Sequence, residues 1–167
     1  GAPVCVYPEA KAPAYHAAQG HDLLAPILAS LAAAGFSGPD APVFIQSFEP
    51  DFVRRASAAT DLPVVFLAGA MEDYRAALAL PGAPFWDGAG VTHAMLFSGE
   101  ASSGLIEEAH RAGVAVHAWT YRDDAPPSPG EPVEPAMRRA LALGLDGLFT
   151  DYPATGVRVV AEFGAGR

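Results

Sequence analysis

Apolar, β-rich runs alternate along this chain with amphipathic runs, and the alternation recurs from one end to the other. Runs of β-branched and aromatic residues predict strands at Val4–Tyr7, Val43–Phe48, Val64–Ala68, His93–Phe97, Val114–Thr120 and Gly147–Thr150. Helical spacing of apolar residues predicts helices at Leu23–Leu31, Ser102–Ala112 and Glu134–Leu143. A glycine follows each helix, at Gly35, Gly113 and Gly144. The order helix, glycine, strand predicts a parallel α/β fold.

Two segments interrupt this order. Leu80–Gly90 mixes aromatic residues with glycine and proline, and Asp123–Pro135 contains five prolines in thirteen residues. Proline lacks a backbone donor and fixes φ, so both segments are predicted to be loops. Such loops either gather around a ligand or stiffen surface connections. Neither separates two pieces large enough to own a core, so residues 1–167 are predicted to form one domain or part of one.

Composition narrows the classes of protein. The chain has 167 residues, 51% of them hydrophobic, and a formal net charge of −9. That charge argues against a general nucleic-acid or anionic-membrane surface, since both need a basic face. No stretch is long and apolar enough to span a bilayer, and the single Cys5 leaves the redox compartment open. The chain opens on Gly1 without a leader, so its true start is expected upstream.

The only lysine, Lys11, stands two residues after Glu9, and every other basic side chain except histidine is an arginine. In an extended strand, residues i and i+2 project from the same face, so a carboxylate and an ammonium would lie side by side. Such a pair can hold a divalent metal and the phosphate that it neutralises. The alternative interpretation is a solvated ion pair at the end of a strand.

Length leaves two architectures open. A closed eight-stranded α/β barrel needs about 250 residues, and this chain accommodates roughly five of its β/α units. An open, doubly wound sheet with the same strands would be complete at this length. The motifs decide between them.

Four segments resemble, in order, the signatures of the glycerophosphodiester phosphodiesterase family, closest to its bacterial exported type. They are Val6–His16, which contains Tyr-Pro-Glu-Ala-Lys-Ala-Pro, Val43–Phe48, Val116–Thr120 and Asp146–Pro153. The resemblance implies a TIM-type (β/α)8 barrel with parallel strands and outer helices. These segments correspond to the fourth, fifth, seventh and eighth strands, so the chain is expected to be the C-terminal portion of that barrel, incomplete here.

The resemblance also implies roles for individual residues. Glu9 resembles the metal-ligand carboxylate of a Ca²⁺ or Mg²⁺ site, and Lys11 resembles the ammonium that contacts phosphate. Trp119 and Phe48 resemble aromatic residues that line the substrate pocket. Trp119 is also explained as a core aromatic, and the sequence does not assign the face on which Phe48 lies. Asp151 either accepts a glycerol hydroxyl or caps the next helix.

The family's His-Arg-Gly run, its Glu-x-Asp pair and its second catalytic histidine do not occur in this sequence. No catalytic residue is therefore assigned, and His21 beside Asp22 is interpreted as the start of a helix. The expected function is metal-dependent hydrolysis of glycerophosphodiesters, which are small molecules, to an alcohol and glycerol 3-phosphate. The alternative is a silent barrel portion that self-associates through exposed strand edges. The resemblance suggests a periplasmic or extracellular location.

Overall fold

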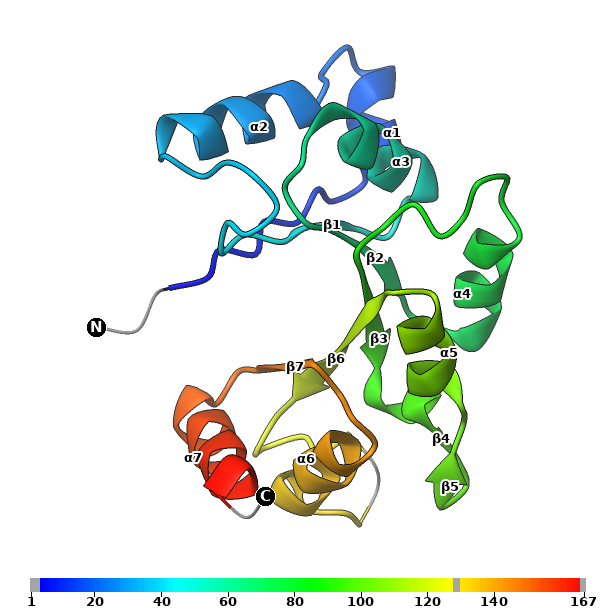
Figure 1. Ribbon diagram of the computed structural model, residues 1–167, viewed down its shortest axis with the longest axis vertical. Helices are drawn as coiled ribbons and strands as arrows, with labels where there is room; N and C mark the ends of the chain where they lie inside the picture. Colours follow the sequence, from blue (N-terminus) through cyan, green and yellow to red (C-terminus); the bar gives the residue numbers. More distant parts are fainter. Residues whose placement is uncertain (1–3, 128–129, 166–167) are drawn as a thin grey trace. The chain divides into compact units, whose positions relative to one another are not determined.

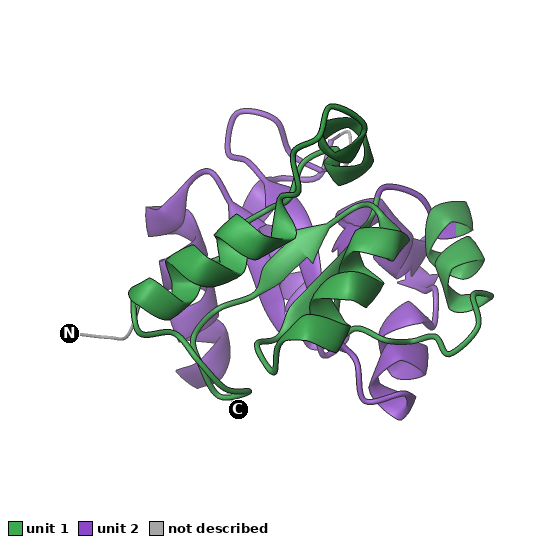
Figure 2. Cartoon of the chain, turned by 90° about the horizontal axis from the view of Figure 1, so that it is seen from above, with its two compact units in different colours: residues 1–68, 72–89 green, residues 69–71, 90–167 purple. Residues whose placement is uncertain are grey.

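The computed structural model describes residues 4–127 and 130–165 and divides the chain into two compact units. Unit 1 comprises residues 1–68 and 72–89, and unit 2 comprises residues 69–71 and 90–167 (Figure 2). Each unit is described by itself below. The prediction of a single domain stays a prediction.

Unit 1 contains the parallel strands β1 and β2, with helices before, between and after them (Figure 1). Its elements in chain order are α1 (Pro13–Ala18), α2 (Leu24–Ala33), β1 (Ile45–Ser47), α3 (Pro50–Ala59), β2 (Val64–Ala68) and most of α4 (Met71–Leu78). β1 pairs with β2 in parallel, with Ile45 opposite Val64. All five residues of β2 are buried, which explains why its sequence is a continuous apolar run without alternation.

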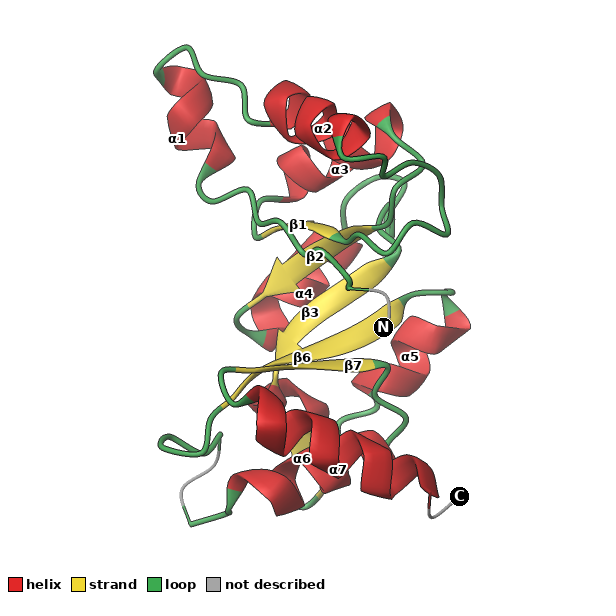
Figure 3. Cartoon of the chain, turned by 90° about the vertical axis from the view of Figure 1, so that its left-hand side faces the viewer, coloured by secondary structure: helices red, strands yellow, loops and turns green. Residues whose placement is uncertain are grey.

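Unit 2 repeats the β/α order and carries a small hairpin. Its elements are β3 (Gly88–Thr92), which begins at the end of unit 1, the 3-10 helix η1 (His93–Leu96), β4 (Phe97–Ser98), β5 (Ala101–Ser102), α5 (Leu105–Arg111), β6 (Ala115–Tyr121), α6 (Val133–Ala142), β7 (Gly147–Thr150) and α7 (Pro153–Ala165). β6 lies between β3 and β7 and pairs with β7 in parallel (Figure 3). Ion pairs Arg158–Glu134 and Arg138–Glu162 join α6 to α7.

The predicted helix ends are confirmed. Gly35, Gly113 and Gly144 have φ values of 84°, 75° and 95°, a region that costs glycine little because it has no Cβ. After α2, the N–H of Phe36 donates to the carbonyl of Leu31, and the N–H of Gly35 donates to that of Ala32. These two backbone hydrogen bonds end the helix and turn the chain toward the next strand.

At the start of α2, the carboxylate of Asp22 accepts from the N–H of Ala25 at 3.2 Å, as its interpretation as a helix-starting residue requires. The Asp22 carboxylate also pairs with Arg55 of α3 at 2.7 Å. These contacts lower the pKa of Asp22, the hydrogen bond from Arg55 being the largest cause.

Several expectations about strands are wrong. Residues His93–Leu96 of the predicted strand His93–Phe97 form a 3-10 helix. The strand lies earlier, at Gly88–Thr92, and overlaps the last three residues of the predicted loop Leu80–Gly90. Glycines 88 and 90 hid it, since they weaken the β pattern while fitting a fully buried strand. Val4–Tyr7 forms only an isolated bridge at Val6, with another at Glu9, because Pro8 cannot donate to a ladder.

The expectation that all strands are parallel fails at one place. β4 and β5 form a two-stranded antiparallel hairpin, with Phe97 opposite Ser102. The hairpin turns at Gly99, which has a φ of 65°. In the other proline-rich segment, α6 already begins at Val133, since Pro135 stands in the first turn where a missing N–H costs nothing.

Candidate functional site

Glu9 stands at the end of an extended segment that runs beside β1. The N–H of Ala10 donates to the carbonyl of Gln46 at 2.9 Å, and the N–H of Gln46 donates to the carbonyl of Pro8 at 2.9 Å. Ala10 is 2% exposed, whereas Lys11 is exposed and Glu9 is half-buried. The alternation directs Ala10 into the core and leaves the Glu9 carboxylate and the Lys11 ammonium accessible, and their predicted roles stay a prediction.

The turn that follows Lys11 is held by the last residue of β1 and by a residue shortly after it. The hydroxyl of Ser47 donates to the carbonyl of Ala10 at 2.9 Å, and Ser47 is fully buried. The carboxylate of Glu49 accepts from the N–H of Ala14 at 2.9 Å, in the first turn of α1. Ala12 takes a φ of 45° at this turn, which is unusual for a residue other than glycine. The position of Lys11 therefore depends on Ser47 and Glu49, which the sequence did not single out.

Phe48 directly follows β1 and is 47% exposed. It lines a pocket of about 420 Å³ together with residues after β1, in β2 and along α4, namely Pro50, Phe66, Leu67, Asp73, Ala76, Ala77 and Leu80. The lining is mostly apolar. A role for Phe48 as a pocket-lining aromatic is thus compatible with its surroundings and stays a prediction.

Trp119 lies on β6 in unit 2 and is half-buried. Three residues later, Arg122 donates to both carboxylate oxygens of Asp124, at 3.0 and 2.9 Å, and to Asp151 at 3.0 Å. Arg122 lowers the pKa of Asp124 to about 2, chiefly through the hydrogen bond. Asp151 thus bonds the guanidinium of Arg122 at the end of β7. A parallel barrel would gather Glu9, Trp119 and Asp151 at the carboxyl ends of its strands, and this gathering stays a prediction.

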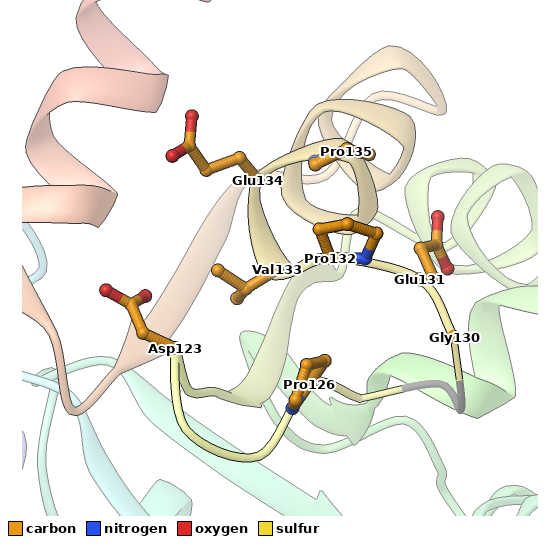
Figure 4. A pocket seen from close by; sticks show the side chains of 8 residues that line it. All are labelled: Asp123, Pro126, Gly130, Glu131, Pro132, Val133, Glu134 and Pro135. Atoms are coloured by element: carbon orange, nitrogen blue, oxygen red, sulfur yellow. The ribbon is translucent and has the colours of Figure 1, made fainter.

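A larger pocket, of about 600 Å³, lies in unit 2 around the proline-rich segment (Figure 4). Three carboxylates line it, and each has a partner. Asp123 accepts from the hydroxyl of Thr155 at 2.8 Å, Glu131 pairs with Arg139 at 2.8 Å, and Glu134 accepts two bonds from Arg158 at 2.8 Å each. None of the predicted site residues lines this pocket.

A metal site needs several donor side chains that converge on one ion. Within residues 4–127 and 130–165, no three histidine, cysteine, aspartate or glutamate side chains come together as a group able to hold a metal ion. In the same ranges, no ion pair joins Glu9 to Lys11. One carboxylate is too few for a Ca²⁺ site, which takes six to eight oxygen ligands. The described residues therefore do not form a complete metal site by themselves.

Two of the five histidines are buried, His93 at 2% and His117 at 8% exposure. Burial lowers the pKa of both rings, because it disfavours the charged form. The ring of His117 packs against Gly147, where an added Cβ would lie 2.8 Å from its Cδ2 atom.

Within the described residues, no helix has both the length and the apolar character needed to cross a membrane.

Comparisons with known proteins agree on one family. The model of the Glycerophosphoryl diester phosphodiesterase family matches residues 6–155. A curated protein of Haemophilus influenzae named glycerophosphodiester phosphodiesterase is 28% identical over 192 residues, which cover 94% of this chain and 52% of that protein.

A solved structure from Agrobacterium tumefaciens, provisionally described as a glycerophosphoryl diester phosphodiesterase, shares the fold. Its TM-score is 0.55 at 20% sequence identity, covering 86% of this chain and 51% of that one. The chain thus spans about half the length of these two relatives. Because the family model covers nearly the whole sequence, in the order of the motifs, this chain belongs to the glycerophosphoryl diester phosphodiesterase family.

Proposed function

We propose that this chain takes part in the hydrolysis of glycerophosphodiesters, with water, to an alcohol and glycerol 3-phosphate. The observation that carries the proposal is the family match over residues 6–155, which includes the segment bearing Glu9 and Lys11. The structure supports it in one respect. Glu9 and Lys11 are accessible at the end of a strand-like segment, the end at which barrel enzymes of this architecture carry their active sites.

Lys11 is proposed to bind the phosphate. A phosphodiester is anionic, and attack by water builds further negative charge on its oxygens. A compact ammonium beside the phosphate stabilises that charge most where it is greatest, in the transition state. Ser47 and Glu49 hold the turn after Lys11, so the backbone from which the ammonium projects is positioned before substrate arrives.

Glu9 is proposed as the ligand that this chain contributes to a divalent metal, Ca²⁺ or Mg²⁺. Its carboxylate oxygens suit either ion, and such an ion supplies positive charge to a reacting phosphate. The described residues offer no complete metal site, so further ligands have to come from elsewhere. No acid or base is assigned to this chain, and Trp119 and Phe48 are proposed to contact the non-reacting parts of the substrate. A periplasmic or extracellular location, which rests on resemblance to the exported type, is also a proposal.

Substitution at the two charged residues tests the proposal in the form of the protein that carries the activity. Glu9→Gln and Lys11→Ala are each expected to lower kcat/KM by an amount equivalent to roughly 2–4 kcal/mol, the cost of one preorganised electrostatic group. Glu9→Gln should act mainly by raising the metal concentration needed for half-maximal rate. Lys11→Ala should act at saturating metal. Lys11→Arg, which keeps the charge, should retain more activity than Lys11→Ala.

The matched control is Arg111→Ala, which removes an exposed cation from the end of α5. It should leave release of glycerol 3-phosphate unchanged. Wild-type kinetics for both Glu9→Gln and Lys11→Ala would overturn the site, and absence of glycerol 3-phosphate release under every metal would overturn the activity.

The second candidate function is a silent unit that self-associates. The observation that favours it is the exposure of Val157 and Val160 on α7, which are 71% and 47% exposed. They are three residues apart and therefore lie on one face of the helix. Monomeric soluble proteins seldom expose large contiguous apolar patches, so an apolar face of this kind favours contact with another molecule. The expected dimerisation is tested below.

A further inference from the structure

A buried histidine joins the ends of two strands of unit 2 to the segment before α6. His93 directly follows β3 and is 2% exposed. Its Nδ1 atom lies 2.9 Å from the hydroxyl of Tyr121, the last residue of β6, which is fully buried. Its Nε2 atom lies 4.0 Å from a carboxylate oxygen of Glu131. Within the described residues, Nε2 has no hydrogen-bond partner.

Among the described residues, the ring of Phe97 and the guanidinium of Arg139 also lie close to His93. The ring of Phe97, on β4, lies 4.9 Å from that of His93 between centroids. The guanidinium of Arg139, on α6, stacks over the ring of Phe97, with its Cζ atom 4.0 Å from the ring centroid. The same guanidinium pairs at 2.8 Å with the Glu131 oxygen that lies near His93. Among the described residues, the charged groups that act on His93 are Glu131 and Arg139, and Tyr121 is a further titratable group in contact with it.

Geometry selects one neutral tautomer. If Nδ1 carried the proton, the Nε2 lone pair would face the Glu131 carboxylate, which would set two negative regions against each other at a buried ring. If Nε2 carries the proton, Nδ1 accepts from the Tyr121 hydroxyl and the N–H points toward an anion. The second arrangement satisfies Tyr121 and places opposite partial charges across the 4.0 Å gap.

Protonation would reverse the first of these bonds. An imidazolium donates from both nitrogens, so the Tyr121 hydroxyl would have to turn from donor to acceptor. Burial is the largest cause that lowers the pKa of His93, Arg139 acts in the same direction, and Glu131 opposes them. The ring is therefore neutral at neutral pH, and its acceptor nitrogen is available to Tyr121.

We propose that His93 is a positioning residue that, as the neutral Nε2–H tautomer, fixes the end of β6 through the Tyr121 hydroxyl and aims its N–H at Glu131. The end of β6 carries Trp119 and leads directly into Arg122. His93 therefore sets where Trp119 stands without touching a substrate. The inference rests on the proposed function only for the role of Trp119 as a substrate contact, and its test does not use activity.

The first measurement is a pH titration of the ¹⁵N-labelled 167-residue chain by long-range ¹H–¹⁵N NMR, with His93→Gln used to assign the signals. We expect an unprotonated Nδ1 and a protonated Nε2 at pH 7. A protonated Nδ1 at pH 7, alone or together with Nε2, would overturn the proposal.

Two charge-removing variants give opposite expectations. Glu131→Gln should lower the midpoint of the His93 titration, and Arg139→Gln should raise it, each by about 1–3 pH units, because they remove opposite charges beside the ring. Glu108→Gln, an exposed carboxylate of α5, is the matched control and should leave the midpoint in place. Shifts of the same sign for the first two variants would show that Glu131 does not face His93.

The last measurement asks whether His93 acts on Trp119. In a Trp86→Phe background, Trp119 is the only tryptophan, so its fluorescence reports the end of β6. We expect its emission to change with the midpoint of His93 and this change to disappear in Tyr121→Phe. A Trp119 emission that titrates identically with and without the Tyr121 hydroxyl would refute the positioning role.

Discussion

The carboxylate of Glu49 accepts a hydrogen bond from the backbone N–H of Ala14 at 2.9 Å, across 35 positions of sequence. It supplies from outside the cap that α1 lacks at its own start, where the N-cap residue is Ala12 with no side-chain acceptor. The bond connects the end of β1 to the turn that carries Lys11. Support for the proposed phosphate contact therefore comes from a residue far away in the sequence.

Removal of this cap should destabilise unit 1. Glu49→Ala is expected to lower the free energy of unfolding by about 0.5–2 kcal/mol, the usual cost of a lost cap. Glu49→Gln, which keeps an oxygen acceptor, should cost less. Urea unfolding followed by circular dichroism measures both. Glu100→Ala, in the exposed turn between β4 and β5, is the control and should change little. Equal stabilities for Glu49→Ala and wild type would show that the bond contributes nothing.

Gly147 should tolerate no side chain. An alanine Cβ there would lie 2.8 Å from Cδ2 of His117 and 3.2 Å from two other ring atoms, so the buried ring or one of the strands β6 and β7 has to shift. Gly147→Ala is expected to cost about 1–3 kcal/mol of stability, as overpacking does. Gly164→Ala, in open space on α7, should be neutral or add up to about 1 kcal/mol. Thermal melts of the pair test this, and a neutral Gly147→Ala would contradict the contact.

Stability should fall below neutral pH because of His117. Burial lowers the pKa of its ring in the folded state, with Asp146 acting weakly in the opposite direction. Between the folded and the ordinary pKa, the unfolded chain binds more protons, so stability is complete above the ordinary value and is lost as pH falls toward the folded value.

In His117→Gln this part of the loss should be absent, and the slope of unfolding free energy against pH should be shallower between about pH 6.5 and the folded midpoint. Urea unfolding at a series of pH values gives the slope directly. Above pH 8, where the ring is neutral in both states, the slopes of variant and wild type should agree. An unchanged slope at acidic pH would assign the loss to other groups.

Self-association should depend on the exposed face of α7. The 167-residue chain is expected to dimerise or aggregate, because an incomplete barrel is expected to leave a strand edge unpaired and because the apolar Val157 and Val160 are exposed. Light scattering coupled to gel filtration measures the mass. Val157→Lys together with Val160→Glu should shift the chain toward monomer, whereas Val4→Lys, at an exposed residue of unit 1, should not. A compact wild-type monomer that melts cooperatively would rule out this prediction.

The sequence by itself determined the family and the recurring alternation of strands and helices, although not every element. Parallel pairing of β1 with β2 and of β6 with β7 follows from helix-glycine-strand repeats, and all three predicted glycines close their helices with positive φ. These features are local, since backbone propensity and turn chemistry act over a few residues. The family motifs were readable for the same reason, each being a short run within one strand or loop.

Only the tertiary structure decided which distant residues meet. The strand Gly88–Thr92 contains two glycines, so its sequence does not predict a strand, and the structure identifies it by its pairing and burial. Helices α1, α3, α4 and α7 were not singled out, because their apolar faces are short and depend on the strands that they cover. Ser47 and Glu49 hold the turn after Lys11, and His93, Tyr121 and Glu131 meet inside unit 2, across sequence separations that no local pattern records. Such contacts form because buried polar groups need partners wherever the fold brings one within reach.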